Sequence, residues 1–371
     1  MKVLLISNMY PSDRYPSYGI FVKNFENALL EKNITVNKVI LLKERNKIKK
    51  IMKYLKFYLV IFWKIIMNKN DLVYVHYASH SAIPIIAASK FRKINLFVNV
   101  HGSDIVPEKQ NQFKYQKYVK RVLEISEKVI VPSEYFKVVV SNKYNINNEK
   151  IEISPSGGVS KEKFYYIKDK KSLRDKYNIN CNLFVIGYVG RIDVGKGWDI
   201  FLRSLKVLVD DNKMEGKIAL IVGSGAQIHD FKILITELGL SEYIIHLDIL
   251  PQHELKNIYN IIDVFCFPTI RDGESLGLVA LESMMCGVPV IGSNVGALPE
   301  YIIENETGKL IEKANYIDLS NKILEMYNEI NDNNTNRLEY AKKCIEISNK
   351  YESKKVNDKI CNVIINRTEL L

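Results

Sequence analysis

Two glutamates on either side of a small-residue turn are the residues whose types and spacing most favour chemistry. Glu274 and Glu282 enclose Ser275–Leu278, and the apolar run Val288–Ile291 follows. The order of loop, helix start and strand suits a phosphorylated ligand, because N–H groups at a helix start point outward and the helix dipole favours an anion. A carboxylate one or two turns further on can bind the hydroxyls of an attached sugar. The alternative is a catalytically silent strand–helix–strand unit.

A second glycine-rich loop carries two cations five residues apart. Arg191 and Lys196 follow the run Gly187–Gly190 and precede a predicted helix. Two cations and free N–H groups suit a nucleoside diphosphate leaving group, because its negative charge grows as the glycosyl bond breaks. The alternative is a pair of solvated basic residues in an ordinary strand–helix loop.

These loops resemble motifs of the retaining glycosyltransferases of family 4, which have the GT-B fold. Glu274 and Glu282 match the E-x7-E signature of that family. Arg191 and Lys196 match its G-R-x(n)-K-G element, and His101, at the end of an apolar run, matches H-G-x-D. The resemblance extends from Gly19 to Glu300 and is strongest from Gly187 to Pro299.

The resemblance implies a role for each matched residue. Arg191 and Lys196 would stabilise the leaving diphosphate, and Glu282 would bind the ribose. Glu274 would bind hydroxyls of the donor sugar, and His101 would lie beside the anomeric centre. The backbone N–H groups that would assist at the diphosphate are those of Ser275, Leu276, Gly277 and Leu278.

At two further places the sequence resembles a family motif but differs from it at one residue. Gly19 matches a glycine loop whose backbone approaches the donor phosphate, but Tyr18 replaces the adjacent glycine of many members. Asp248 and Ile249 fall beside the backbone that recognises the nucleobase, and Asp248 stands where the family usually has glycine. The identity of the base, UDP- or GDP-linked, therefore stays open.

No D-x-D triplet occurs in the chain, although metal-dependent glycosyltransferases of the other major fold use one to bind a divalent ion. With cations and a helix start available for the diphosphate, we expect no metal and no cofactor. The resemblance implies same-face attack assisted by the departing phosphate, without a protein nucleophile.

The length of 371 residues and the alternation of strands and helices predict two α/β domains. Apolar runs that do not alternate indicate parallel sheets covered on both faces. We expect two doubly wound Rossmann-like domains, residues 1–165 for the acceptor and 166–350 for the nucleotide sugar, with the active site in the cleft between them. The resemblance implies that a last helix, about 351–371, crosses back onto the first domain.

A net charge of +11 requires a partner or an explanation. The segment from Lys43 to Lys69 is basic and aromatic, and Ile48, Ile51, Met52, Leu55, Leu59, Phe62 and Ile66 share one helical face. Such a helix is typical of an anionic membrane surface, and the residues expected to face it are Lys49, Lys50, Lys53, Lys56 and Trp63. The alternative is that this apolar face packs on the domain's own sheet. No nucleic-acid partner is expected, because no recognised module accompanies the charge.

The five scattered cysteines predict free thiols in a reducing compartment. No apolar run of about 18 residues occurs, so no membrane-spanning helix is expected. We therefore expect a cytoplasmic protein, peripheral at the inner face of the cell membrane.

The expected function is transfer of a sugar from a nucleoside-diphosphate sugar to a hydroxyl of a lipid-linked saccharide, with retention, in assembly of a bacterial surface polysaccharide. The alternatives are a nucleotide-sugar epimerase of the same fold and a non-catalytic sugar-nucleotide-binding protein. The sugar, the linkage, the pathway and the oligomeric state stay open.

Overall fold

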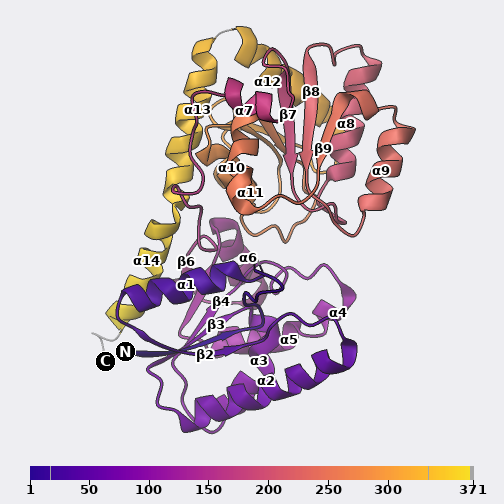
Figure 1. Ribbon diagram of the computed structural model, residues 1–371. Coiled ribbons are helices and arrows are strands. Elements are labelled where there is room, and N and C mark those ends of the chain that lie inside the picture. Colours follow the sequence, from indigo (N-terminus) through magenta and orange to yellow (C-terminus); the bar gives the residue numbers. More distant parts are fainter. Residues whose placement is uncertain (17, 333, 368–371) are drawn as a thin grey trace. The chain divides into compact units, whose positions relative to one another are not determined.

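The computed structural model describes residues 1–16, 18–332 and 334–367, which form two compact units (Figure 1). Unit 1 comprises Met1–Gly158 and the residues from Lys354 onward, and unit 2 comprises Val159–Ser353. The expected boundary at 165/166 thus lies inside unit 2. The chain returns to unit 1 through helix α14 (Ser353–Asn366).

Unit 1 is built on a six-stranded sheet in the order β2-β1-β3-β4-β5-β6. All of its paired strands are parallel. The strands are β1 (Lys2–Ser7), β2 (Thr35–Ile40), β3 (Leu72–His76), β4 (Leu96–Asn99), β5 (Lys128–Val131) and β6 (Ile151–Ile153). Sequence analysis missed β6, which is only three residues long.

Helices cover both faces of this sheet because its strands are apolar on both sides. The helices are α1 (Ile20–Glu31), α2 (Lys47–Met67), α3 (Ala78–Ser89), α4 (Gln110–Phe113), α5 (Gln116–Ile125), α6 (Glu134–Tyr144) and α14. Leu4 and Ile6 of β1 pack with α2, α3, α5 and α6, whereas Val3 and Leu5 pack with α1 and α14. Two separate helices, α4 and α5, lie between β4 and β5 in the sequence.

Unit 2 repeats the plan with a parallel sheet in the order β12-β11-β10-β7-β8-β9. The strands are β7 (Phe184–Val189), β8 (Lys217–Val222), β9 (Ile244–Leu247), β10 (Val264–Phe267), β11 (Val290–Ser293) and β12 (Gly308–Ile311). The helices are α7 (Lys171–Lys176), α8 (Trp198–Asp210), α9 (Ile228–Glu237), α10 (Gln252–Ile261), α11 (Leu278–Met285), α12 (Tyr316–Asp332) and α13 (Asn334–Ser348). One core joins the sheet to α10, α11 and α13, and another joins it to α8, α9 and α12.

Each sheet has a point where the strand order reverses. In unit 1 the chain leaves β1 for β2 and then returns to β3 on the other side of β1; in unit 2 the reversal lies between β7 and β10. Ligands of doubly wound sheets bind at the carboxyl ends of strands beside such a point. The predicted class, α/β with two doubly wound parallel sheets, is confirmed.

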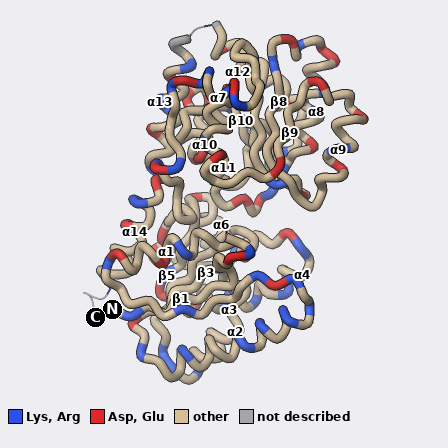
Figure 2. The backbone as a smooth tube through the Cα atoms, viewed as in Figure 1, with Lys and Arg blue, Asp and Glu red and all other residues tan. Residues whose placement is uncertain are grey.

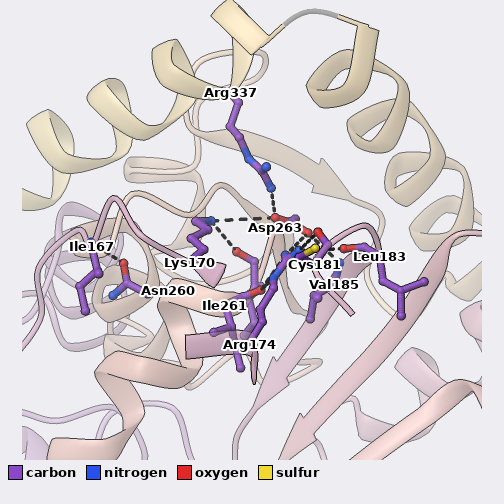
Figure 3. A network of polar contacts seen from close by, with 11 residues as sticks. Ile167, Lys170, Arg174, Cys181, Leu183, Val185, Asn260, Ile261, Asp263 and Arg337 are labelled. Atoms are coloured by element: carbon purple, nitrogen blue, oxygen red, sulfur yellow. Dashed lines mark hydrogen bonds and ion pairs between the residues drawn. The ribbon is translucent and has the colours of Figure 1, made fainter. Parts of the chain in front are cut away.

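A buried ionic network occupies the opposite, amino-terminal end of β10 (Figure 3). Asp263, whose side chain is 2% exposed, accepts hydrogen bonds from Arg174 (2.7 Å) and from the backbone N–H of Val185 (2.8 Å). Lys170 lies 3.9 Å from the same carboxylate, and Arg337 of α13 pairs with it. Burial holds the pKa of Lys170 well below its usual range. One carboxylate thus joins α7, β7, β10 and α13.

Helix α2 has two apolar faces. Phe57, Ile61 and Ile65 are buried in the core of unit 1. Of the predicted apolar stripe, Phe62 and Ile66 are partly buried against that core. The members that stay exposed, by 61–72%, are Ile48, Ile51, Met52, Leu55 and Leu59. For these five, the alternative that the stripe packs on the domain's own sheet is wrong.

Within the described ranges, no helix is long and apolar enough to cross a membrane. All five cysteines are free thiols, and only Cys181 is exposed.

Candidate functional site

The reversal point of unit 2 brings together two of the predicted residues. Lys196 follows β7 and Glu274 follows β10, and the Nζ of Lys196 donates to the Oε2 of Glu274 over 2.7 Å. Their side chains are only 14% and 12% exposed, so this ion pair is weakly screened by solvent. A fixed cation and a carboxylate therefore lie side by side where a doubly wound sheet binds its ligand.

The two loops that carry this pair are locked together by backbone contacts. Gly197 begins α8 with φ 75°, and a Cβ there would lie 1.9 Å from the carbonyl oxygen of Pro268. Only glycine allows that approach. Thr269 donates to the carbonyl of Gly195 (3.2 Å) and lies 3.4 Å from Glu274.

Arg191, the second predicted cation, lies apart from this ion pair. Its side chain is 67% exposed and donates to the Oδ2 of Asp193 over 2.5 Å. The other oxygen of Asp193 accepts from the N–H of Ala226, after β8 (2.8 Å). Asp193 thus ties Arg191 to the carboxyl end of β8, whereas Lys196 is held by Glu274.

Helix α11 starts at the predicted anion position. Gly277 is its N-cap residue, and Ser275, Leu276 and Gly277 lie in the loop before Leu278, its first residue. The N–H of Ala280 already donates to the carbonyl of Gly277 (2.9 Å). The first N–H groups of an α-helix have no acceptor within the helix, so those of Leu278 and Val279 are suited to a ligand. The loop is held in place by Tyr301, whose hydroxyl donates to the carbonyl of Leu276 (2.7 Å).

Glu282 lies one turn into α11 and accepts a hydrogen bond from the hydroxyl of Tyr259 (2.9 Å). Burial raises the pKa of the Glu282 carboxyl to about 7. The protonated form of this carboxyl is therefore accessible near neutral pH, and in that form it can both donate to and accept from a diol. The nucleobase candidates Asp248 and Ile249 are exposed and directly follow the edge strand β9.

In unit 1, His101 lies two residues beyond β4 with its ring between two aromatic rings. The ring centroids of Phe21 and Tyr77 are 4.6 Å and 4.8 Å from that of His101. Asp104 accepts from the backbone N–H groups of His101 (3.0 Å) and Ala78 (3.1 Å). It therefore clamps the loops that follow β3 and β4, and burial raises the pKa of its carboxyl to about 6.

Gly19, in the loop after β1, is the N-cap residue of α1 with φ 75°. A Cβ on it would lie 2.6 Å from the backbone carbon of Met9. Any other residue would push these two parts of the loop apart, so Gly19 sets the shape of the loop before Phe21.

Sequence analysis missed a groove of about 570 Å³ in unit 1. It is lined by Tyr54, Tyr58, His80, Ser103, Lys109 and Tyr115, among others. The hydroxyl of Tyr54 lies 3.0 Å from Nδ1 of His80. Aromatic rings with polar edges suit a saccharide. The interleaved tyrosines of α2 were visible in the sequence, but their partners come from three other segments.

Other residues of these sites were also missed. They are Thr269, Asp193, Tyr259, Tyr77 and His76, and each of them contacts one of the predicted site residues. His76 alone left a sequence signal, a histidine ending the apolar run before the one that leads to His101.

Comparison with known proteins gives two family matches. Residues 20–157 match the model described as Glycosyltransferase Family 4, and residues 169–347 match Glycosyl transferases group 1. An uncharacterized glycosyltransferase of Methanocaldococcus jannaschii is 29% identical over 70% of this chain and 66% of its own length. The capsular polysaccharide biosynthesis glycosyltransferase CapM of Staphylococcus aureus is 33% identical over 52% of this chain and 50% of its own.

Solved structures share the fold over the whole chain. Sucrose-phosphate synthase from Thermosynechococcus elongatus has a TM-score of 0.81 at 18% identity, covering 100% of both chains. Anabaena HepE in complex with UDP has a TM-score of 0.76 at 16% identity, covering 99% of this chain and 100% of its own.

Proposed function

The chain belongs to the GT-B glycosyltransferases, with a family 4 and a group 1 domain, and from this membership we propose that it transfers a sugar from a nucleoside-diphosphate sugar to a hydroxyl of a saccharide, with retention. The observation that carries the proposal is the Lys196–Glu274 pair at the reversal point of unit 2. UDP is the proposed nucleotide, since HepE was solved in complex with UDP and with UDP-glucose.

In the proposed reaction, Lys196 and Arg191 stabilise the negative charge on the departing diphosphate. The N–H groups of Ser275 to Leu278 assist, and the dipole of α11 adds to their effect. Glu282 binds the ribose and Glu274 the hydroxyls of the donor sugar, while His101 contacts that sugar near its anomeric carbon. Since Lys196 is paired with Glu274 in the free protein, the incoming diphosphate competes with Glu274 for its ammonium group.

We propose that the departing diphosphate guides same-face attack, with no metal ion and no covalent glycosyl-enzyme. A retaining mechanism through a protein nucleophile would instead leave a sugar bonded to a carboxylate. Mass spectrometry of a reaction stopped in turnover would reveal such an adduct on Glu274, and finding one would contradict this part.

The proposed acceptor is a lipid-linked saccharide at an anionic membrane surface, in assembly of a surface polysaccharide. Helix α2 supports this with the five exposed members of its apolar stripe and with Trp63 and Met67, beside Lys49, Lys50, Lys53 and Lys56. Figure 2 shows basic residues along α2, which contains no acidic residue. The groove begins among those exposed residues, at Ile51 and Leu55, and its lining reaches Ser103, two residues from His101.

Nucleotide binding tests the donor site directly. In a thermal-shift panel of nucleoside diphosphates, we expect UDP to raise the melting temperature of the wild type through mass action, and Lys196→Ala/Arg191→Ala to abolish the shift. Lys213→Ala, which removes an exposed lysine of unit 2, is the control. Equal shifts in the wild type and the double variant would contradict the donor assignment.

Vesicle flotation tests the membrane proposal. Replacing Lys49, Lys50, Lys53 and Lys56 by glutamate should abolish binding to anionic vesicles, since each basic residue near such a surface contributes about 1 kcal/mol. Trp63→Ala alone, which removes an exposed ring from the same helix, should weaken binding without abolishing it. Unchanged flotation of the charge-reversed protein would mean that α2 is not the membrane contact.

A further inference from the structure

Two histidines of unit 1 lie ring to ring at the carboxyl ends of neighbouring strands. His76 is the last residue of β3, and its Nδ1 lies 2.9 Å from Nε2 of His101, just beyond β4. The strand register sets this contact, because His76 is paired with Asn99. A hydrogen bond between two ring nitrogens contains one hydrogen, so one ring donates and the other accepts.

Neighbouring aromatic side chains hold both imidazole rings in place. His76 is 2% exposed, and its ring packs against those of Phe25 (5.3 Å between centroids) and Tyr74 (5.1 Å). His101 is stacked on Tyr77, whose backbone has φ 66°, a strained value for a residue with a side chain. Strain of this kind persists where surrounding contacts over-determine a conformation, and here it places an aromatic ring on His101.

Both rings are neutral in this setting. Burial holds the pKa of His76 well below its usual range and lowers that of His101 to about 3. The question is therefore which neutral ring carries the shared hydrogen, and the hydrogen bond made by one nitrogen decides the tautomer of the whole ring.

The second ring nitrogen of His76, Nε2, indicates which of the two rings donates the hydrogen bond. This nitrogen is buried, and no group among the described residues hydrogen-bonds to it. If Nε2 carried the hydrogen, it would be a buried donor without a protein acceptor, which folded proteins avoid more strictly than an unpaired acceptor. The hydrogen therefore belongs on Nδ1 of His76, which points at His101.

We propose that His76 is a positioning residue whose Nδ1–H donates to Nε2 of His101 and holds His101 as the Nδ1–H tautomer. His101 then presents a hydrogen-bond donor, not a base, and the group it suits is an oxygen of the transferred sugar. This last step rests on the proposed function, whereas the tautomer itself does not.

Nitrogen-15 NMR of the full-length protein with labelled histidine tests the tautomer without any assay of activity. The chain has 6 histidines, and loss of a signal in His101→Gln assigns the ring. We expect a protonated Nδ1 and an unprotonated Nε2 on His101 at neutral pH. His76→Asn, which keeps an N–H donor near the position of Nδ1, should preserve that pattern, and His76→Leu should abolish it.

Kinetics supply the second readout. His76→Leu should lower kcat by about 10- to 100-fold, by analogy with the loss seen when partners that orient metal-ligating histidines are removed, and leave KM for the donor nearly unchanged. His76→Asn should restore most of kcat.

An Nε2–H tautomer in the wild type, or an unaltered His101 spectrum in His76→Leu, would overturn the proposal. If His76→Leu does not fold, the spectra of the wild type and of His76→Asn decide. The expected tautomer in a protein that transfers no sugar from any nucleotide would contradict the proposed function and support the histidine assignment.

Discussion

Lys196→Ala should lower kcat/KM for sugar transfer by about 100- to 1,000-fold, the typical cost of removing one group that stabilises transition-state charge. The reason is position: the ammonium group is fixed by Glu274 at the reversal point of unit 2 and is only 14% exposed. In the proposed reaction, a cation held there would act on the leaving diphosphate in a poorly solvated site, where charge interactions are stronger than in water.

The Glu274→Gln variant distinguishes the role of Glu274 from that of Lys196. This change keeps the side-chain shape but frees Lys196 from its carboxylate, so affinity for UDP should be equal or higher while transfer falls. The loss of kcat/KM in the Lys196→Ala/Glu274→Gln double variant should be smaller than the product of the losses in the two single variants, because paired groups are not independent. Steady-state kinetics and calorimetric titration with UDP give both quantities.

Lys206→Ala is the matched control, since it removes a lysine of α8 that pairs with Asp210 on the surface. Its kinetics should match those of the wild type. If Lys196→Ala also retained wild-type kcat/KM, the diphosphate role of Lys196 would be wrong.

Asp263→Ala should lower the free energy of unfolding by about 3–5 kcal/mol, the cost of leaving buried charges without their partner. Three basic residues surround this single carboxylate, and Arg174 is only 6% exposed. Denaturant unfolding followed by circular dichroism measures the loss. Asp263→Asn should lie between the wild type and alanine, because it keeps an acceptor for Val185 N–H.

The control for this prediction is Asp211→Ala, which removes an ion pair with Lys213 whose two side chains are about half exposed. Exposed pairs contribute about 0–1 kcal/mol, so its unfolding curve should almost overlay that of the wild type. A similarly small loss in Asp263→Ala would show that the basic residues find solvent or other partners.

Local pattern predicted most of the fold. The parallel arrangement of both sheets followed from strands that are apolar on both faces. Strand β6 was not predicted, because a strand of three residues is too short to show a periodic pattern of apolar side chains. On α2, apolar residues lie on two faces, and spacing alone cannot tell which face is buried.

The candidate site was predictable only in its parts. Lys196 and Glu274 were each found from their loops, but their contact spans 78 residues and depends on β7 and β10 being neighbours. Strand order is a tertiary property, and no local signal contains it. The same holds for His76 and His101, whose contact follows from the pairing of β3 with β4.

The return of the chain into unit 1 has a consequence for biosynthesis. Ile360, Cys361 and Ile364 of α14 are buried with Val3 and Leu5 of β1, so one core combines segments that lie on either side of unit 2 in the sequence. Unit 2, made of continuous residues, is available to fold while that core still lacks a helix. Domains generally fold in the order of their synthesis. Here the unit whose strands are made before unit 2 is completed only after it, and its apolar sheet face stays partly uncovered until α14 has left the ribosome.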